Sequence, residues 1–149
     1  MSHFELASDA KCWVYQSNRP FSTTEKAWLE EVVNRFVDQW AAHGNKLLAQ
    51  GKIIGDYHVV LGVDENQAGA SGCSIDSSVR FIKEIGQELG VDFFNRMNLL
   101  VEEGNDNKIV PFSEISNHPD AYVYNNLIQT IGDLDSKWKV KVSESPFFR

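Results

Sequence analysis

The sequence predicts a single α+β domain with a mainly antiparallel sheet and amphipathic helices packed on one face of that sheet. Three observations support this prediction. The chain has 149 residues, of which 42% are apolar, and this length fits one domain with a substantial core. Segments with helical and with strand periodicity follow one another in a mixed order rather than in strict alternation, as in α+β folds. No internal repeat or flexible linker divides the chain, so the predicted domain spans residues 1–149.

The N-terminal third of the chain predicts one strand followed by one helix. Residues 1–10 are polar and are expected to be loosely ordered. The aromatic, β-rich run at 11–16 is typical of a strand. Ser22 and Glu25 then have the spacing of a capping box, and apolar residues recur behind them at helical intervals. Gly44 stands where a left-handed residue is expected to end this helix.

The middle of the chain predicts a second strand and a second helix. The pair at 50–51 indicates a break, and residues 57–63 then alternate with the period of two expected for a strand that buries one face. A loop of small residues follows at 64–74. Apolar residues recur at helical spacing over 75–89, and Gly90 is the expected end of that helix.

The C-terminal third predicts a hairpin and a final strand. Residues 97–112 contain two strand-like runs around a polar turn, and Pro111 favours an edge position because proline cannot donate a ladder hydrogen bond. Residues 121–138 have helical spacing but open like a strand, so their structure stays open. The alternating residues 139–142 indicate a strand, and residues 144–149 are expected to be loosely ordered.

The charge and hydropathy of the chain exclude several classes of partner. The chain carries 14 Lys and Arg against 21 Asp and Glu, for a net charge of -7. Such a charge does not match the field of nucleic acid or of an anionic membrane, so we expect neither partner. No apolar run approaches the roughly 20 residues that span a bilayer, and the N-terminus lacks the pattern of a secretory signal. We therefore expect a soluble, cytoplasmic protein.

The two cysteines do not indicate a metal site. Cys12 and Cys73 lie far apart in the sequence and have no Cys or His partner at zinc-binding spacing. We therefore expect no metal and no cofactor. In a reducing cytoplasm both thiols are expected to stay free.

The most concentrated candidate site is the run of small residues at 69–78, which joins the second predicted strand to the second predicted helix. Glycine lets backbone N–H groups approach a ligand closely, and a helix N-terminus adds exposed donors and partial positive charge. Ser71, Gly72, Ser74 and Asp76 are therefore candidate binding residues for a small anionic ligand, such as a carboxylate or a phosphate. The structural alternative is that Ser74 or Asp76 caps the helix and the glycines only form the turn.

Two arginines and one histidine are further candidate ligand-binding residues. Arg19 follows the first predicted strand in a turn, and Arg96 follows two phenylalanines. An arginine can bind a carboxylate or a phosphate through two parallel N–H groups. The alternative for Arg96 is that its stem packs over Phe93 or Phe94, or that it pairs with Asp92. His58 is expected on the less buried face of its strand, where it can reach a ligand.

A second hypothesis is a cysteine-dependent enzyme in which Cys73 is the catalytic nucleophile or a redox thiol. The donors at a helix N-terminus stabilise a thiolate, and the same N–H groups would stabilise an oxyanion. A thiol nucleophile also needs a base, and the candidates are His43 and His58, then His118 and His3. The structural alternative for a free cysteine is a small buried apolar residue.

A third hypothesis is a non-catalytic, homo-oligomeric interaction protein, most simply a homodimer. Aromatic residues near Trp138, or the C-terminal tail at 146–149, would dock on the partner if they are exposed. The alternative for the tail is a frayed chain end.

Several motifs together resemble a family of small uncharacterised bacterial proteins that are often labelled "ABC transporter ATPase". The motifs are the run SGCSIDSSV at 71–79, Trp13-x-Tyr15 with Arg19, Trp40-x-x-His43-Gly44 and Phe93-Phe94-x-Arg96. The resemblance extends from about Trp13 to Trp138. It implies that the SGCSID segment is a family feature, which carries over Cys73, Ser74 and Asp76, but it implies no activity. The sequence does not support the ATPase label, because the chain contains no Gly-Lys-Ser/Thr of a phosphate-binding loop.

Overall fold

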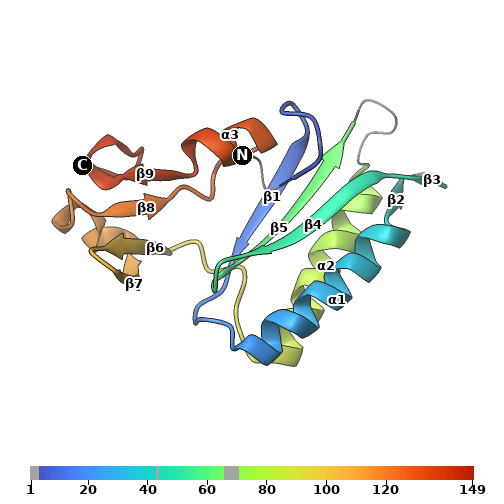
Figure 1. Ribbon diagram of the computed structural model, residues 1–149, viewed down its shortest axis with the longest axis horizontal. Coiled ribbons are helices and arrows are strands. Elements are labelled where there is room, and N and C mark those ends of the chain that lie inside the picture. Colours follow the sequence, from blue (N-terminus) through green and yellow to red (C-terminus); the bar gives the residue numbers. More distant parts are fainter. Residues whose placement is uncertain (1–3, 43, 66–70) are drawn as a thin grey trace.

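The computed structural model describes residues 4–42, 44–65 and 71–149. In these residues the strands form two antiparallel sheets and a short ribbon (Figure 1). In chain order the elements, with η for a 3-10 helix, are β1 (Lys11–Gln16), α1 (Thr23–Gln39), β2 (Ala41–Ala42), β3 (Asn45–Lys46), β4 (Leu48–Ile54), β5 (His58–Asp64), α2 (Gly72–Leu89), β6 (Asn98–Glu103), β7 (Asp106–Pro111), η1 (Phe112–Asn117), β8 (Tyr122–Tyr124), α3 (Ile131–Lys137), β9 (Lys139–Lys141) and η2 (Val142–Glu144). The predicted α+β class is therefore confirmed.

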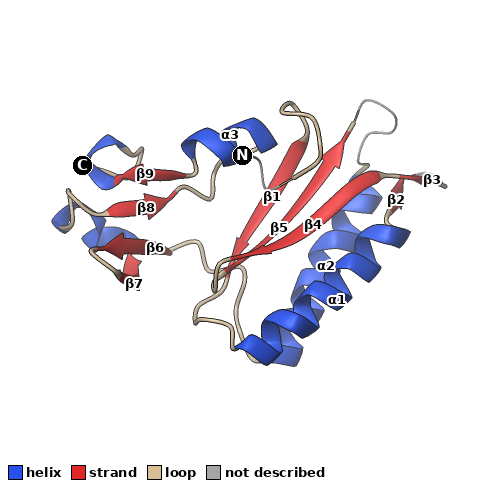
Figure 2. Cartoon of the chain, viewed as in Figure 1, coloured by secondary structure: helices blue, strands red, loops and turns tan. Residues whose placement is uncertain are grey.

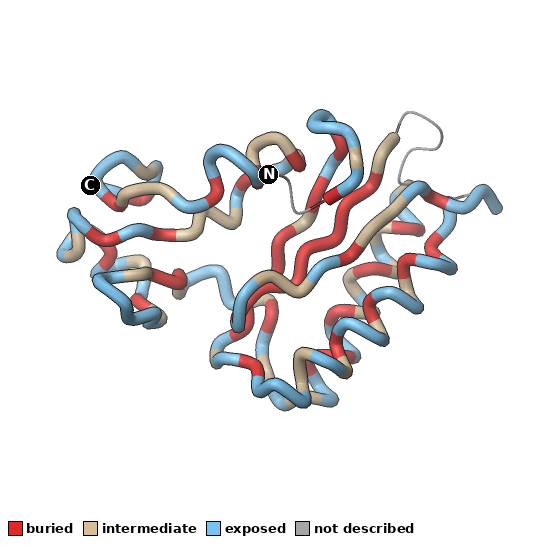
Figure 3. Tube along the Cα trace, viewed as in Figure 1, coloured by how far each residue is buried: buried red, intermediate tan, exposed pale blue. Residues whose placement is uncertain are grey.

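The first sheet has the strand order β1-β5-β4, and its two faces are covered by different elements (Figure 2). Helices α1 and α2 cover one face, where they pack on Val59, Leu61 and Val63 of β5. On the opposite face, Val60 packs in a second cluster that includes Leu134 of α3. Figure 3 shows β5 buried along its length. The predicted buried face is confirmed, and the second face is buried as well, because α3 and the N-terminal residues cover it.

Glycine at position 51 allows β4 to pass close beneath α1. The predicted break at 50–51 is wrong, since β4 runs through both residues as a regular strand paired with β5. A Cβ on Gly51 would lie 2.2 Å from Cγ1 of Val33 and 3.2 Å from Cδ2 of Leu61. The glycine therefore marks a close approach of helix and strand rather than a turn.

Both long helices begin with a reciprocal side-chain cap. Ser22 and Glu25 form the predicted capping box of α1. Helix α2 ends as predicted at Gly90, which is left-handed with φ 69°. Gly44 does not end α1, which stops at Gln39. Instead Gly44, with φ 80°, lies in the turn between β2 and β3.

The second sheet has the order β7-β6-β8-β9 and contains the C-terminal third of the chain. The predicted hairpin is confirmed as β6 and β7, and Pro111 lies on the edge strand β7. The open question at 121–138 resolves into strand β8 followed by helix α3, so both sequence patterns have a structural counterpart. Phe4 and Phe147, near the two ends expected to be loosely ordered, are both buried.

The side chain of Gln16 joins the two sheets. Gln16 lies at the end of β1 and is 8% exposed. Its Oε1 accepts from the backbone N–H of Leu100 (3.1 Å), and its Nε2 donates to the backbone oxygen of Asn98 (3.2 Å). Asn126 donates to the same Oε1 (2.9 Å) and accepts from Nε1 of Trp138 (3.1 Å). A buried polar network therefore connects β1, β6 and the segment before α3. Within the part of the chain that the structure describes, no helix meets the length and apolarity needed to cross a membrane.

Candidate functional site

The first turn of α2 carries the residues predicted to bind an anion. Two of them are bonded to each other: the backbone N–H of Ser74 donates to Oγ of Ser71 (3.1 Å), and the backbone N–H of Ser71 donates to Oγ of Ser74 (2.7 Å). Ser71 is thus the N-cap, and Ser74 is 2% exposed. Gly72 and Asp76 are exposed, while positions 69 and 70 of the predicted loop lie outside the described residues.

Cys73 is exposed in the same turn, but the two candidate bases that the structure describes lie elsewhere. The backbone oxygen of Cys73 accepts from Oγ of Ser77 (3.1 Å). His58 contacts aromatic rings on the face of the first sheet opposite to α2. His118 pairs with Glu103 of the second sheet (3.2 Å). The other candidates, at positions 3 and 43, lie outside the described residues.

His58 is almost completely buried, at 2% exposure, which contradicts its predicted place on a less buried face. Its ring centroid lies 4.7 Å from that of Trp138 and 5.3 Å from that of Tyr124. Burial lowers the pKa of His58 to about 3, against a smaller opposing effect of the Asn126 side chain. Its Nε2 has no hydrogen-bond partner among the described residues. His58 lines a cavity of about 370 Å³. A neutral imidazole cannot attract an anion by charge, so this cavity lacks the chemistry predicted for an anion site.

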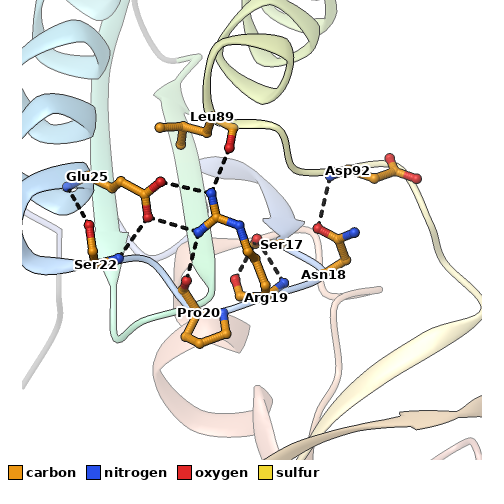
Figure 4. A network of polar contacts seen from close by, with 8 residues as sticks. All are labelled: Ser17, Asn18, Arg19, Pro20, Ser22, Glu25, Leu89 and Asp92. Carbon is orange, nitrogen blue, oxygen red and sulfur yellow. Dashed lines mark hydrogen bonds and ion pairs between the residues drawn. The ribbon is translucent and has the colours of Figure 1, made fainter.

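Arg19 holds the turn after β1 against both long helices (Figure 4). Its two terminal nitrogens donate to the two carboxylate oxygens of Glu25 at 2.9 and 2.8 Å. They also donate to the backbone oxygens of Pro20 (3.1 Å) and Leu89 (2.6 Å). This pairing holds the pKa of the Glu25 carboxyl at about 2. The guanidinium is therefore bonded to other groups of the protein. It lies near the C-terminal end of α2, at Leu89, and not near the first turn of that helix.

Arg96 differs from Arg19, because it borders open space. It is exposed and lines two neighbouring cavities of about 510 and 160 Å³. Both cavities are also lined by Val14, Asn126 and Leu127, so we describe them together as the β1 groove. Further residues of the larger cavity are Asp9, Lys11, Cys12, Trp13, Tyr15, Ile75 and residues 128–130. The groove therefore brings Arg96 together with the first turn of α2, through Ile75.

One wall of the β1 groove is the outer edge of strand β1. The backbone N–H of Ser17 donates to the oxygen of Tyr57, towards the β5 side, whereas that of Cys12 donates to Gln129 on the opposite side. Backbone groups in a strand alternate in direction with a period of two. The N–H and C=O of Val14 therefore point the same way as the N–H of Cys12, away from β5 and towards the groove.

The segment before α3 leaves β1 at this point. Gln129 and Thr130 pair with β1 near Cys12. The preceding residues turn back on Asn125, which accepts from the backbone N–H of Leu127 (3.1 Å) and of Ile128 (3.4 Å). They consequently do not continue the pairing along β1. The backbone N–H and C=O of Val14 have no hydrogen-bond partner among the residues that the structure describes.

The charge of the β1 groove is concentrated at one end. Arg96 makes neither an ion pair nor a hydrogen bond with any described residue. Burial raises the pKa of the Tyr15 hydroxyl, and the bond to Ser78 and the nearby charge of Arg96 oppose this rise. At the other end Lys11 is paired with Glu65 (2.8 Å). An unpaired guanidinium therefore lies beside unpaired backbone groups.

Residue type alone indicated Arg96, but nothing in the sequence indicated the open edge at Val14. Which backbone groups of a strand stay unpaired depends on the neighbours that the fold supplies. Among the described residues, no three His, Cys, Asp or Glu side chains gather in a way that could hold a metal ion. Comparison of the chain with protein-family models, with curated protein sequences and with solved structures finds no match.

Proposed function

We propose that the protein binds a small ligand with an anionic group, a carboxylate or a phosphate, in the β1 groove. The observation that carries this proposal is Arg96, a guanidinium without an ion-pair partner among the described residues, between two cavities. Arginine presents a planar fork of N–H donors that matches carboxylate and phosphate oxygens. Arg96 supplies the charge that the ligand neutralises.

Two further features support a ligand site at this place. The free N–H and C=O of Val14 supply a donor and an acceptor next to the charge, which lets a bound molecule be oriented as well as attracted. Trp13, Ile75 and Leu127 supply apolar walls. Binding sites commonly combine apolar walls with a few convergent polar groups.

The alternative of a cysteine-dependent enzyme has less support. The exposed Cys73 is not among the residues that line the β1 groove, and neither described candidate base lies on the face that α2 covers. The homo-oligomer hypothesis relied on exposed aromatic residues near Trp138 or on the tail at 146–149. Trp138 is 6% exposed and packs in the core around α3, and Phe147 is buried, whereas Phe148 is exposed. We propose ligand binding in the β1 groove as the function with the most support.

The proposal is tested with a matched pair of ligands and a matched pair of variants. The ligands are hexanoate and its primary amide, titrated into ¹⁵N-labelled protein while the amide signals of residues 13–15 and 96 are followed, with inorganic phosphate as the third probe. We expect hexanoate or phosphate to shift these signals, and we expect hexanamide, the uncharged ligand, to leave them unchanged. A hydrogen bond to a charged group contributes about 1.5–3 kcal/mol, so Arg96→Gln should weaken anion binding at least tenfold.

Arg80→Gln is the control, because Arg80 is an exposed arginine on α2 that does not line the groove. It should bind the anion like the wild type. Equal anion affinity of wild type and Arg96→Gln, or no response of the groove signals to any of the anions, would overturn the proposal.

A further inference from the structure

The geometry points to one class of ligand for this site: the C-terminal end of an extended peptide, which adds to the free edge of β1 as a short extra strand. This inference rests on the proposed function, since it uses the same groove and the same arginine. It goes further because it assigns roles to the backbone of β1 and to the length and direction of the groove.

The first argument is the pair of backbone groups at Val14. A strand that adds to a sheet edge offers a C=O to each free N–H and an N–H to each free C=O. Val14 presents one free N–H and one free C=O towards the groove, and both belong to the same residue. A simple carboxylate cannot satisfy both groups, because it has no donor at neutral pH to match the C=O. A peptide group supplies both partners.

The second argument is the place of the charge. Arg96 lines the larger cavity together with Tyr15, and the smaller cavity together with Gln16, so it lies towards the end of β1. The opposite end of the groove has Asp9 and the Lys11–Glu65 ion pair. A terminal carboxylate therefore binds at the Gln16 end, which makes the bound peptide parallel to β1.

The third argument is the length of the free edge. Gln129 occupies the edge at Cys12, and the Gln16 side chain is bonded to the second sheet just beyond Val14. Only two or three ligand residues fit between these two limits at the roughly 3.3 Å rise of a strand. The apolar walls then contact the last side chains of the peptide, so we expect apolar residues at its C-terminal end.

The experiment compares four probes by isothermal titration calorimetry with the full chain. They are acetyl-Thr-Val-Leu-Val with a free carboxylate, the same peptide as its C-terminal amide, a set of free-acid peptides N-methylated at one backbone nitrogen each, and hexanoate. We expect the free-acid peptide to bind at least tenfold more tightly than hexanoate and than the amide. Because strand N–H groups alternate in direction, N-methylation should weaken binding at least tenfold at one of two adjacent nitrogens and little at the other.

Amide hydrogen exchange gives the structural readout. Binding of the free-acid peptide should slow exchange at Val14, and hexanoate should leave exchange there unchanged. Arg96→Gln should weaken binding of the free-acid peptide until its affinity approaches that of the C-terminal amide. Arg80→Gln should leave the affinity for the free-acid peptide unchanged. If the peptide binds no more tightly than hexanoate, or the amide binds as tightly as the acid, the chain-end inference is wrong and the anion site stands. If neither peptide nor hexanoate binds, and inorganic phosphate also leaves the groove signals unchanged, both proposals fail.

Discussion

The protein should lose stability between neutral pH and pH 5, and replacement of His58 by phenylalanine should remove most of that loss. The imidazole is 2% exposed, and burial lowers its pKa to about 3 in the folded protein. The unfolded chain has an ordinary histidine pKa of about 6.5. Between these two values the unfolded state binds the extra proton and the folded state does not. Stability is therefore complete above about pH 6.5 and falls as the pH decreases towards 3.

The size of this effect follows from the two pKa values. One proton bound only by the unfolded state changes the free energy of unfolding by about 1.4 kcal/mol for each pH unit. From pH 7.5 to pH 5 the wild type should lose about 2 kcal/mol through His58. Few carboxylates of the unfolded chain are protonated in that range, so the histidine dominates the change.

The assay is urea denaturation at pH 7.5, 6.0 and 5.0, followed by tryptophan fluorescence. His58→Phe should have a nearly flat free energy of unfolding over this range, and His58→Leu serves if the larger ring does not fit. His118→Gln is the control, because His118 is paired at the surface with Glu103; it should retain the wild-type slope. A flat wild-type profile, or a full slope in His58→Phe, would refute the reasoning, since His58 would then accept a proton in the folded state.

Two further substitutions test the packing and the capping. Gly51→Ala should destabilise the fold by about 1–3 kcal/mol, because the new Cβ would lie 2.2 Å from Cγ1 of Val33; Gly72→Ala, where a Cβ meets nothing within 4 Å, is the control in thermal denaturation. Ser71→Ala should cost about 1 kcal/mol through loss of the N-cap of α2, and Ser77→Ala should cost less. An unchanged melting temperature in Gly51→Ala or Ser71→Ala would contradict the corresponding contact.

The elements that could be predicted from the sequence are those with a local cause. The capping box of Ser22 and Glu25 uses residues three positions apart. Gly90 needs only its own left-handed backbone, and Pro111 lacks its own N–H donor. Each of these signals acts within one turn or one strand, so the sequence pattern contains the information.

The errors come from contacts between distant segments. The sequence around Gly51 suggests a break. Glycine is needed there because any Cβ would collide with Val33, on a helix 18 positions earlier in the chain. His58 looked like a surface residue because its strand alternates, but Trp138 and Tyr124, far along the chain, cover that face. Gly44 was placed at a helix end because the ribbon of β2 and β3 has no strong pattern of its own.

The candidate site divides in the same way. Arg96 was predicted from residue type, whereas the expected cap at Ser74 or Asp76 is wrong, because α2 begins earlier, at Gly72, and Ser71 is its N-cap. The free N–H and C=O of Val14 result from a turn closed by Asn125 more than a hundred positions later. No local pattern around Val14 could have indicated that its edge stays open.

The side-chain amide of Gln16 has a consequence for how the molecule unfolds. It bonds Asn98 and Leu100 of β6 as a neighbouring strand's peptide group would, and Asn126 and Trp138 extend this bonding to the segment around α3. If either sheet unfolded alone, these buried polar groups would lose their hydrogen-bond partners, and an unpaired buried polar group costs free energy. The two halves should therefore melt cooperatively, in a single transition, and their slowest-exchanging amides should report the same global opening.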